Sequence, residues 1–311
     1  MLSVIIPAYN ERLMIEKAAR TISDLLNKSS IEHELIFIDD GSRDLSWEII
    51  QKLSERNSDI RGIHFSRNFG KEAAIMAGLA ECVGDCSVVI DCDLQHPPEK
   101  IVEMYHLWQK GYEIVEGRKI SRGKEGMLHK FSAKTFYALI SKMAGIDMMN
   151  ASDFKLLDRR VVDVLIHMNE RNVFFRALSS WVGFRTAVVE FDVMEREAGE
   201  SKWSPASLIR YALNNISSFS AAPMQIVTFL GGIMFLVSLI LGVISLAQKI
   251  SGQALEGFTT VIIIQLFSSS IIMVSLGIIG FYIARIYEEV KCRPRYIIKS
   301  QCGGRTDDRI D

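Results

Sequence analysis

Two aspartates one residue apart, Asp91 and Asp93, follow an apolar run that begins at Val88. The run is typical of a buried strand, and two prolines, Pro97 and Pro98, end the segment after it. In an extended chain alternate side chains point to one face, so both carboxylates can face the same side. Two hard oxygen ligands suit Mg²⁺ or Mn²⁺, which often takes one or two carboxylates together with substrate phosphates. A polar turn after a core strand would have the same sequence, so the pair alone leaves both roles open.

Strands and helices are expected to alternate along the first part of the chain. The expected strands are 2–7, 34–39, 62–65, the run from Val88, and 113–117; the expected helices are 13–26, 45–56, 68–80 and a segment after Pro98. This alternation is typical of a parallel, doubly wound α/β sheet. Polar residues follow the carboxyl end of each strand, namely Asn10, Glu11, Asp39, Asp40, Arg67, Asn68, Asp91, Asp93 and Arg118.

One crevice lined by these loops is the simplest explanation of that recurrence, because ligands of open α/β sheets bind outside the carboxyl ends of the strands. Neither a Gly-x-Gly-x-x-Gly fingerprint nor a phosphate-binding P-loop occurs in the sequence. A nucleotide would therefore be held by side chains and a metal ion.

The pattern is looser after Arg118. The segment 119–134 is basic, and most of its cations fit a solvated helix face. Asp153 precedes an apolar run, 174–184 is expected to be a buried helix containing Trp181, and 185–193 alternates like an edge strand. A polar loop follows at 196–203.

Ser204 and Pro205 have the residue types that begin a helix. The helix after them is amphipathic and fits either a membrane surface or an ordinary core. Two uncharged apolar stretches follow at 226–247 and 258–284. Each is longer than the roughly 18 residues that suggest a membrane span, which predicts a hairpin of two transmembrane helices.

The cations beside the two spans predict the orientation of the hairpin. Lys202, Arg210, Arg285, Lys291, Arg293, Arg295 and Lys299 all flank its outer ends. By the positive-inside rule the N-terminal domain and both termini are then cytoplasmic, and no signal peptide is expected before the first strand. We expect the last residues, 301–311, to be disordered.

Charge and cysteine content narrow the function further. The net charge of -1 does not suggest nucleic-acid binding. The five cysteines form no Cys-x-x-Cys pair, which indicates reduced thiols, and Cys82 and Cys86 are expected to be small core residues. A crevice for a nucleotide and a metal, tethered to a membrane hairpin, favours transfer from a water-soluble activated donor to a membrane-embedded acceptor.

Several motifs, taken in order and spacing, resemble those of family 2 glycosyltransferases of the GT-A fold. They are Pro-Ala-Tyr-Asn-Glu at 7–11, Asp-Asp-Gly-Ser at 39–42, Arg-Asn-Phe-Gly-Lys-Glu at 67–72, Asp-Cys-Asp-Leu-Gln-His-Pro-Pro-Glu at 91–99, Ser-Asp-Phe-Lys-Leu-Leu at 152–157, Gly-Glu-Ser-Lys-Trp at 199–203 and Ile-Tyr-Glu-Glu-Val-Lys-Cys-Arg-Pro-Arg-Tyr at 286–296. More narrowly the chain resembles polyprenyl-phosphate (bactoprenol) glycosyltransferases, with dolichyl-phosphate mannose synthase as a more distant relative. His96 departs from the acid found in many relatives. The Gln-x-x-Arg-Trp motif of processive synthases is absent, which argues for transfer of one sugar per acceptor.

The resemblance implies a role for each matching residue. Pro7, Tyr9, Glu11, Asp39 and Asp40 would cradle the nucleoside, Asp91 would position donor and metal, Asp93 would bind Mg²⁺ or Mn²⁺, and Gln95 would lie near the donor. Arg118 and Lys130 would hold phosphate oxygens of donor or lipid, and Asp153 would occupy the acid/base position. Arg196, Ser201 and Lys202 would belong to a loop that closes over the diphosphate.

The resemblance also implies a division of the chain and a reaction. The expected parts are a cytosolic GT-A domain at 1–200, a loop and interfacial helix at 201–223, two transmembrane helices within 224–285 and a cytosolic basic tail at 286–311. The expected reaction is inverting transfer of one sugar, from UDP-glucose or UDP-N-acetylglucosamine, to polyprenyl phosphate in the cytoplasmic membrane. Expected partners are further copies of the chain, as in a tetramer, and a flippase and a downstream glycosyltransferase.

Two alternatives remain open at this point. One is a glycosyltransferase acting on another lipid, such as diacylglycerol, whose neutral hydroxyl would need a true base. The other is a non-catalytic subunit that binds nucleotide sugars. The intact acids Asp91, Asp93 and Asp153 count against the second alternative.

Overall fold

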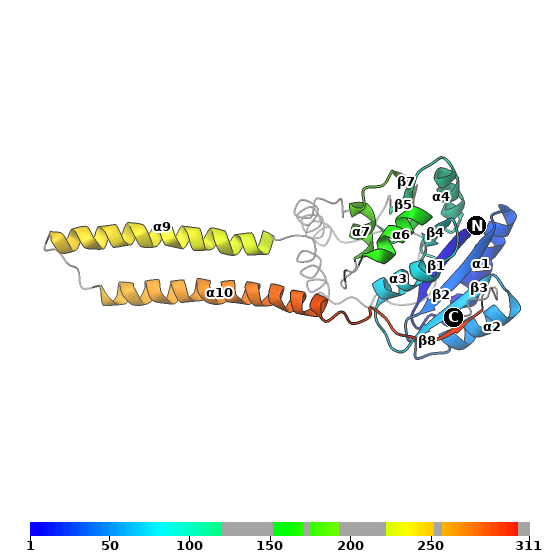
Figure 1. Ribbon diagram of the computed structural model, residues 1–311, viewed down its shortest axis with the longest axis horizontal. Coiled ribbons are helices and arrows are strands. Elements are labelled where there is room, and N and C mark those ends of the chain that lie inside the picture. The colour runs from blue at the N-terminus through cyan, green and yellow to red at the C-terminus, as the bar shows by residue number, and fades with distance from the viewer. Residues whose placement is uncertain (120–151, 169, 171–173, 193–221, 252–256, 304–311) are drawn as a thin grey trace. The chain divides into compact units, whose positions relative to one another are not determined.

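The computed structural model describes residues 1–119, 152–168, 170, 174–192, 222–251 and 257–303 (Figure 1). The chain divides into two compact units. The first comprises Met1–Trp203 with Arg293–Asp311, and the second comprises Ser204–Cys292.

The described part of the first unit is built on a mostly parallel sheet of eight strands in the order β7-β5-β6-β4-β1-β2-β3-β8. The strands are β1 (Leu2–Ala8), β2 (His33–Asp39), β3 (Ile60–Phe65), β4 (Cys86–Val89), β5 (Ile114–Lys119), β6 (Lys155–Asp158), β7 (Thr186–Phe191) and β8 (Ile298–Cys302). β6 runs antiparallel to its neighbours β4 and β5, and β8 runs antiparallel to β3. The other pairs are parallel, so the predicted α/β class is confirmed.

Helices cover both faces of this sheet. α1 (Ile15–Lys28), α2 (Ser46–Arg56) and α4 (Glu99–Gln109) pack on one face, and α3 (Lys71–Glu81), α6 (Arg159–His167) and α7 (Phe175–Trp181) pack on the other. The sequence of β2 requires a helix layer on each face, because Leu35 and Phe37 face the first layer and Ile36 and Ile38 face the second. A strand buried on both faces has a continuous apolar sequence, as the segment Leu35–Ile38 of β2 does. Cys82 and Cys86 are buried core residues, as predicted.

β4 begins and ends earlier than the sequence suggested. It ends at Val89, where its pairings with β1 and β6 both end. The next residues turn, because the N–H of Leu94 donates to the carbonyl of Asp91 and Leu94 has a left-handed backbone with φ of 54°. The expectation that Asp91 and Asp93 lie on an extended strand is therefore wrong.

The segment expected to be a disordered tail contributes a strand instead. Gln301 and Cys302 belong to β8, which pairs with the outer side of β3. An unpaired edge strand exposes backbone donors and acceptors, and β8 supplies partners for those of β3. Residues 304–311 lie outside the described part of the chain.

The segment 174–184 is also only partly as predicted. α7 covers Phe175–Trp181, and its Phe175 and Leu178 are buried. Trp181 is 63% exposed, so the prediction that it is buried is wrong. The predicted strand at 185–193 is β7, and it does lie at an edge of the sheet.

The second unit contains two long helices, α9 (Ala222–Ile250) and α10 (Phe258–Val290), which pack against each other as an antiparallel pair (Figure 1). α10 continues past residue 284, where the predicted span ends. Within the described residues these are the two helices that are long and apolar enough to cross a membrane. Many of their large apolar side chains are exposed, among them Phe235 and Val243 of α9 and Met273 of α10. The predicted interfacial helix lies outside the described residues.

Candidate active site

The strand order brings Asp91 and Asp153 to the same edge of the sheet. Asp91 follows β4, and Asp153 precedes β6. Because β6 is antiparallel to β4, the amino end of β6 lies beside the carboxyl end of β4. The ammonium of Lys71, at the start of α3, joins the two acids: its Nζ lies 2.6 Å from Asp91 Oδ1 and 2.7 Å from Asp153 Oδ2.

Arg176 in α7 holds Asp153 from another direction. Its Nε and Nη2 donate to the two carboxylate oxygens of Asp153 at 2.6 and 2.9 Å. Burial alone would raise the pKa of Asp153, but Lys71 and Arg176 outweigh it and hold that pKa far below its usual range. Burial likewise opposes the charge of Lys71, and the nearby Asp91 and Asp153 reverse that effect and raise its pKa. Asp153 is therefore ionised throughout the neutral pH range.

Glu72 ties α3 to α7 below this cluster. The backbone N–H of Phe175 donates to Glu72 Oε2 at 2.9 Å. Burial, and then the negative charge of Asp153, raise the pKa of Glu72 to about 7. Glu72 is therefore partly protonated near neutral pH, whereas the neighbouring Asp153 stays ionised.

Lys155 binds α7 through several hydrogen bonds. Its side chain is buried, and its Nζ donates to the carbonyl of Arg176 at 3.2 Å and to the hydroxyl groups of Ser179 and Ser180 at 2.9 and 3.3 Å. Glu116 Oε1 lies 3.6 Å from the same Nζ. Burial lowers the pKa of Lys155 even so. The lysine positions the turn of α7 that carries Arg176.

The donor set at Asp91 and Asp93 fits a divalent ion that also binds phosphate. Asp93 Oδ1 accepts a hydrogen bond from the N–H of Gln95 at 3.1 Å, and Asp91 Oδ2 lies 3.9 Å from His96 Nδ1. In the described part of the chain no group of three or more His, Cys, Asp or Glu side chains could hold a metal alone. Mg²⁺ and Mn²⁺ accept two carboxylates when substrate oxygens complete the shell, so Asp91 and Asp93 would hold the ion jointly with a diphosphate.

His96, which stands where many relatives have an acid, packs as an aromatic ring near the carboxyl end of β4. It is buried against Phe154 and Phe191, with ring centroids 5.2 and 5.4 Å apart. Burial lowers the pKa of its imidazole, which is therefore neutral at pH 7.

At the β1–β2 side the acids are bound by the protein itself. Asp40 accepts the N–H groups of Phe69 and Gly70 at 2.6 and 2.9 Å. Asp39 accepts the N–H of Ser42 at 3.1 Å, and its other oxygen lies 2.6 Å from Nδ1 of His64. Both carboxylates are buried. A nucleoside that contacts them would use a remaining lone pair of these oxygens.

The loop after β1 is joined to the loop after β2. The N–H of Asn10 donates to Ser42 Oγ at 2.8 Å, and the N–H of Glu11 donates to Ser46 Oγ at 3.0 Å. Asn10 has a left-handed backbone with φ of 56°, which asparagine tolerates better than most residues. Tyr9, in the same loop after β1, is 38% exposed.

A model of glycosyl transferase family 2 matches residues 3–165. The chain belongs to glycosyltransferase family 2. It is 38% identical over 303 residues to an uncharacterized glycosyltransferase, YkcC, of Bacillus subtilis (strain 168), covering 97% of this chain and 94% of that protein. It is 36% identical over 302 residues to a bactoprenol glucosyl transferase of Shigella phage SfX, covering 96% of this chain and 99% of that one.

Among solved structures, the fold is similar to glucosyl-3-phosphoglycerate synthase from Mycobacterium tuberculosis in complex with Mn²⁺, UDP-glucose and phosphoglyceric acid. That likeness has a TM-score of 0.46 and 22% identity, and it covers 70% of this chain and 77% of the other. Membership in the family makes the protein a glycosyltransferase enzyme.

The site residues expected from sequence lie at three places in the described structure, and some lie outside it. Asp91 and Asp153 are brought together by Lys71, with Asp93 and Gln95 in the adjoining turn. Asp39 and Asp40 lie at the β1–β2 side, where the N–H of Asp40 donates to the carbonyl of Ala8, next to Pro7 in β1. Arg118 lies in β5, and its buried Nε has no hydrogen-bond partner within the described residues. The remaining candidates, Lys130, Arg196, Ser201 and Lys202, lie outside the described residues.

Sequence reasoning missed Lys71, Glu72, Arg176 and Lys155 as site residues of this glycosyltransferase. Lys71 and Glu72 lie in the quoted motif at 67–72, directly after β3 at the carboxyl edge of the sheet, so their place could have identified them. Arg176 carries no such local signal, because it reaches Asp153 from a helix that follows in sequence.

Proposed function

We propose that this enzyme transfers one sugar from a nucleotide-diphosphate sugar to polyprenyl phosphate, with inversion at the anomeric carbon. The observation that carries the proposal is the similarity to a bactoprenol glucosyl transferase along 96% of this chain and 99% of that protein. UDP-glucose is the favoured donor for the same reason, and UDP-N-acetylglucosamine is the second candidate.

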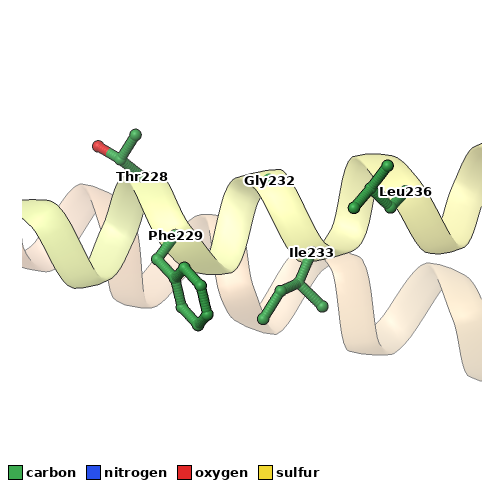
Figure 2. A pocket seen from close by; sticks show the side chains of 5 residues that line it. All are labelled: Thr228, Phe229, Gly232, Ile233 and Leu236. Carbon is green, nitrogen blue, oxygen red and sulfur yellow. The ribbon is translucent and has the colours of Figure 1, made fainter.

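The second unit suits a lipid acceptor. We propose that α9 and α10 cross the membrane as a hairpin, since both are long, apolar and richly exposed. A hollow of about 760 Å³ on α9 is lined by Thr228, Phe229, Gly232, Ile233 and Leu236 (Figure 2). Its lining is almost wholly apolar, so the hydrocarbon chain of a lipid suits it better than a polar ligand. The cations Lys291 and Arg293 after α10 favour a cytoplasmic end there.

The proposed transfer does not require a strong general base. An oxygen of the acceptor phosphate forms a bond to the anomeric carbon while the bond from that carbon to the diphosphate oxygen breaks, and the nucleoside diphosphate leaves with the electron pair. A phosphate monoester has a second pKa near 6, so the attacking oxygen is already largely anionic at pH 7. Asp153, kept ionised by Lys71 and Arg176, then serves to orient these two cations rather than to take a proton.

Charge on the leaving diphosphate must be offset in such a reaction. Asp91 and Asp93 would hold a divalent ion, which would supply positive charge at the diphosphate. Lys71 would bring a further cation to the same place, because its Nζ is already between Asp91 and Asp153 and its side chain is 39% exposed. The nucleoside would lie toward Tyr9 and the linked loops after β1 and β2.

A panel of donors and acceptors tests the proposal. Purified full-length protein in detergent is given UDP- and GDP-sugars with Mg²⁺ or Mn²⁺, and undecaprenyl phosphate, undecaprenol or diacylglycerol as acceptor. The products are weighed by mass spectrometry. We expect one hexose mass added to undecaprenyl phosphate and none added to the two alcohols. A glycosylated diacylglycerol instead would overturn the acceptor, and nucleotide-sugar binding without any product would favour a non-catalytic role.

A further inference from the structure

Lys119 is the last residue of β5 and lies at the edge of the sheet that carries the acid cluster. The loop of Asp153 is fastened to this end of the strand by two hydrogen bonds. The N–H of Gly117 donates to the carbonyl of Phe154 at 2.8 Å, and Ser152 Oγ donates to the carbonyl of Gly117 at 2.6 Å. Lys119 therefore lies two residues after Gly117, the β5 residue to which the loop of Asp153 is hydrogen-bonded.

Its ammonium differs from the other cations of the site. Lys71 and Arg176 each bind a carboxylate, whereas the ammonium of Lys119 has no hydrogen bond or ion pair with any described residue. Lys119 is half-buried. Burial, and then repulsion by Arg176, lower its pKa, and Asp91 and Asp153 only partly oppose this. A partly desolvated cation beside another cation is unfavourable until an anion arrives.

The strand order indicates which anion would bind Lys119. β2 and β1, whose loops carry Asp39, Asp40 and Tyr9, lie on one side of β4, and β6 and β5 lie on the other. With the nucleoside at the β1–β2 side and the metal ligands after β4, the donor extends toward β4. Lys119 therefore lies beyond the reacting centre as seen from the nucleoside, on the side where an acceptor must approach.

We propose that Lys119 is the side chain that recognises the phosphate group of the acceptor, a polyprenyl monophosphate. Lysine binds phosphate as a compact charge, and the group it binds would be the nucleophile itself. The cation would hold the phosphate near the anomeric carbon without a fixed geometry, so that an oxygen stays free to attack. This inference rests on the proposed function and extends it to a residue for the acceptor.

Binding measured without turnover tests this assignment separately from the reaction. Full-length wild type, Lys119→Met and Lys119→Arg are titrated with farnesyl phosphate and with farnesol, in the presence of UDP and Mn²⁺, by isothermal calorimetry. The exposed Lys52 of α2 supplies a matched control, Lys52→Met, with the same change of charge. Lys119→Gln serves as a second neutral variant, and melting temperatures verify that each variant folds.

The expected result is a loss of about 10- to 100-fold in affinity for farnesyl phosphate in both neutral variants, the usual scale for a hydrogen bond to a charged group. Affinity for farnesol should be unchanged, and Lys119→Arg and Lys52→Met should stay close to wild type. Wild-type affinity for farnesyl phosphate in folded Lys119→Met or Lys119→Gln would overturn the proposal.

Steady-state kinetics then separate the two sources of phosphate. The KM for undecaprenyl phosphate should rise in Lys119→Met while the KM for the nucleotide sugar stays constant. A rise confined to the KM for the nucleotide sugar would assign Lys119 to the donor diphosphate and contradict the proposal. If wild type makes no glycolipid from any lipid phosphate, the proposed function fails, and the binding experiment still decides the role of Lys119.

Discussion

The acids at the two ends of the candidate site are bound in different ways. At the β1–β2 side, Asp40 is held by two backbone N–H groups, and Asp39 by one N–H and His64. At the β4–β6 side, Asp91 and Asp153 are held by the long side chains of Lys71 and Arg176. Backbone donors are fixed by the fold, whereas a lysine or arginine can exchange one anion for another by rotating.

The β1–β2 end of the site is therefore preformed, whereas the β4–β6 end can adjust to a ligand. Lys71 and Arg176 keep 39% and 35% of their side chains exposed, so in the proposed reaction both would be accessible to a phosphate. The backbone-bound acids instead hold the loops after β2 and β3, beside which the proposed nucleoside would lie. Substitutions at the first end should therefore change stability most, and substitutions at the second end should change turnover most.

The largest effect is expected from Asp93→Asn. Loss of one carboxylate would weaken the proposed metal site, to which the protein would contribute two carboxylates, so turnover should fall by roughly 1,000-fold, which corresponds to several kcal/mol of transition-state stabilisation. The rate of sugar transfer and the melting temperature are measured together. Asp24→Asn, an exposed acid on α1, is the control and should change neither. Turnover of Asp93→Asn at the wild-type rate would remove Asp93 from the metal site.

Asp40→Asn should show the opposite profile. An amide can accept only one of the two N–H groups and turns its own NH₂ toward the other, so the protein should lose about 1–3 kcal/mol of stability. Chemical or thermal unfolding of the detergent-solubilised protein measures this loss. A stability equal to that of Asp24→Asn would show that the Asp40 contacts are not needed to hold the loop.

Asp153→Asn should retain part of its activity. If the acceptor phosphate is already ionised, the rate should fall by about 10- to 100-fold through misplacement of Lys71 and Arg176, and the loss should be the same from pH 7 to pH 9. The pH profile of kcat distinguishes this from a missing base. A loss of all activity that no pH restores would favour a neutral lipid hydroxyl as acceptor.

The smallest effect concerns Glu72. Its pKa rises from an ordinary 4.5 to about 7 in the folded protein, so the folded state binds a proton more tightly than the unfolded chain does. Stability should therefore fall as the pH rises from about 4.5 to about 7. In Glu72→Gln this dependence disappears while the acceptor for the N–H of Phe175 remains. The melting temperature of the variant relative to wild type should accordingly be higher at pH 8 than at pH 5, and an equal difference at both would contradict the shift.

The sequence predicted the backbone-bound end of the candidate site better than the end bound by Lys71 and Arg176. The apolar run of β2 followed by Asp39 and Asp40 predicts a buried strand with acids at its carboxyl end, and the structure has both. The turn at Asp91–Leu94 was not predicted, since it depends on where the pairing of β4 with β1 and β6 ends.

Long-range contacts account for the other differences. The position of β6 between β4 and β5 cannot be seen in a linear pattern, yet it places Asp153 beside Asp91. Arg176 reaches Asp153 from α7, and no spacing in the sequence indicates that pair. β8 has the mixed composition Ile-Lys-Ser-Gln-Cys and forms a strand because it pairs with β3, as edge strands often depend on context.

We propose that this family 2 glycosyltransferase adds one sugar to a lipid phosphate in a reaction that needs a divalent ion. The most direct test is to supply wild-type protein with undecaprenyl phosphate and UDP-glucose, remove divalent ions with a chelator, and then restore Mg²⁺ or Mn²⁺. Mass spectrometry should find undecaprenyl phosphate carrying a single hexose before chelation, none after it, and the same product once the ion is restored. Product formation at an unchanged rate in the chelated protein, or a product on another acceptor alone, would contradict the account.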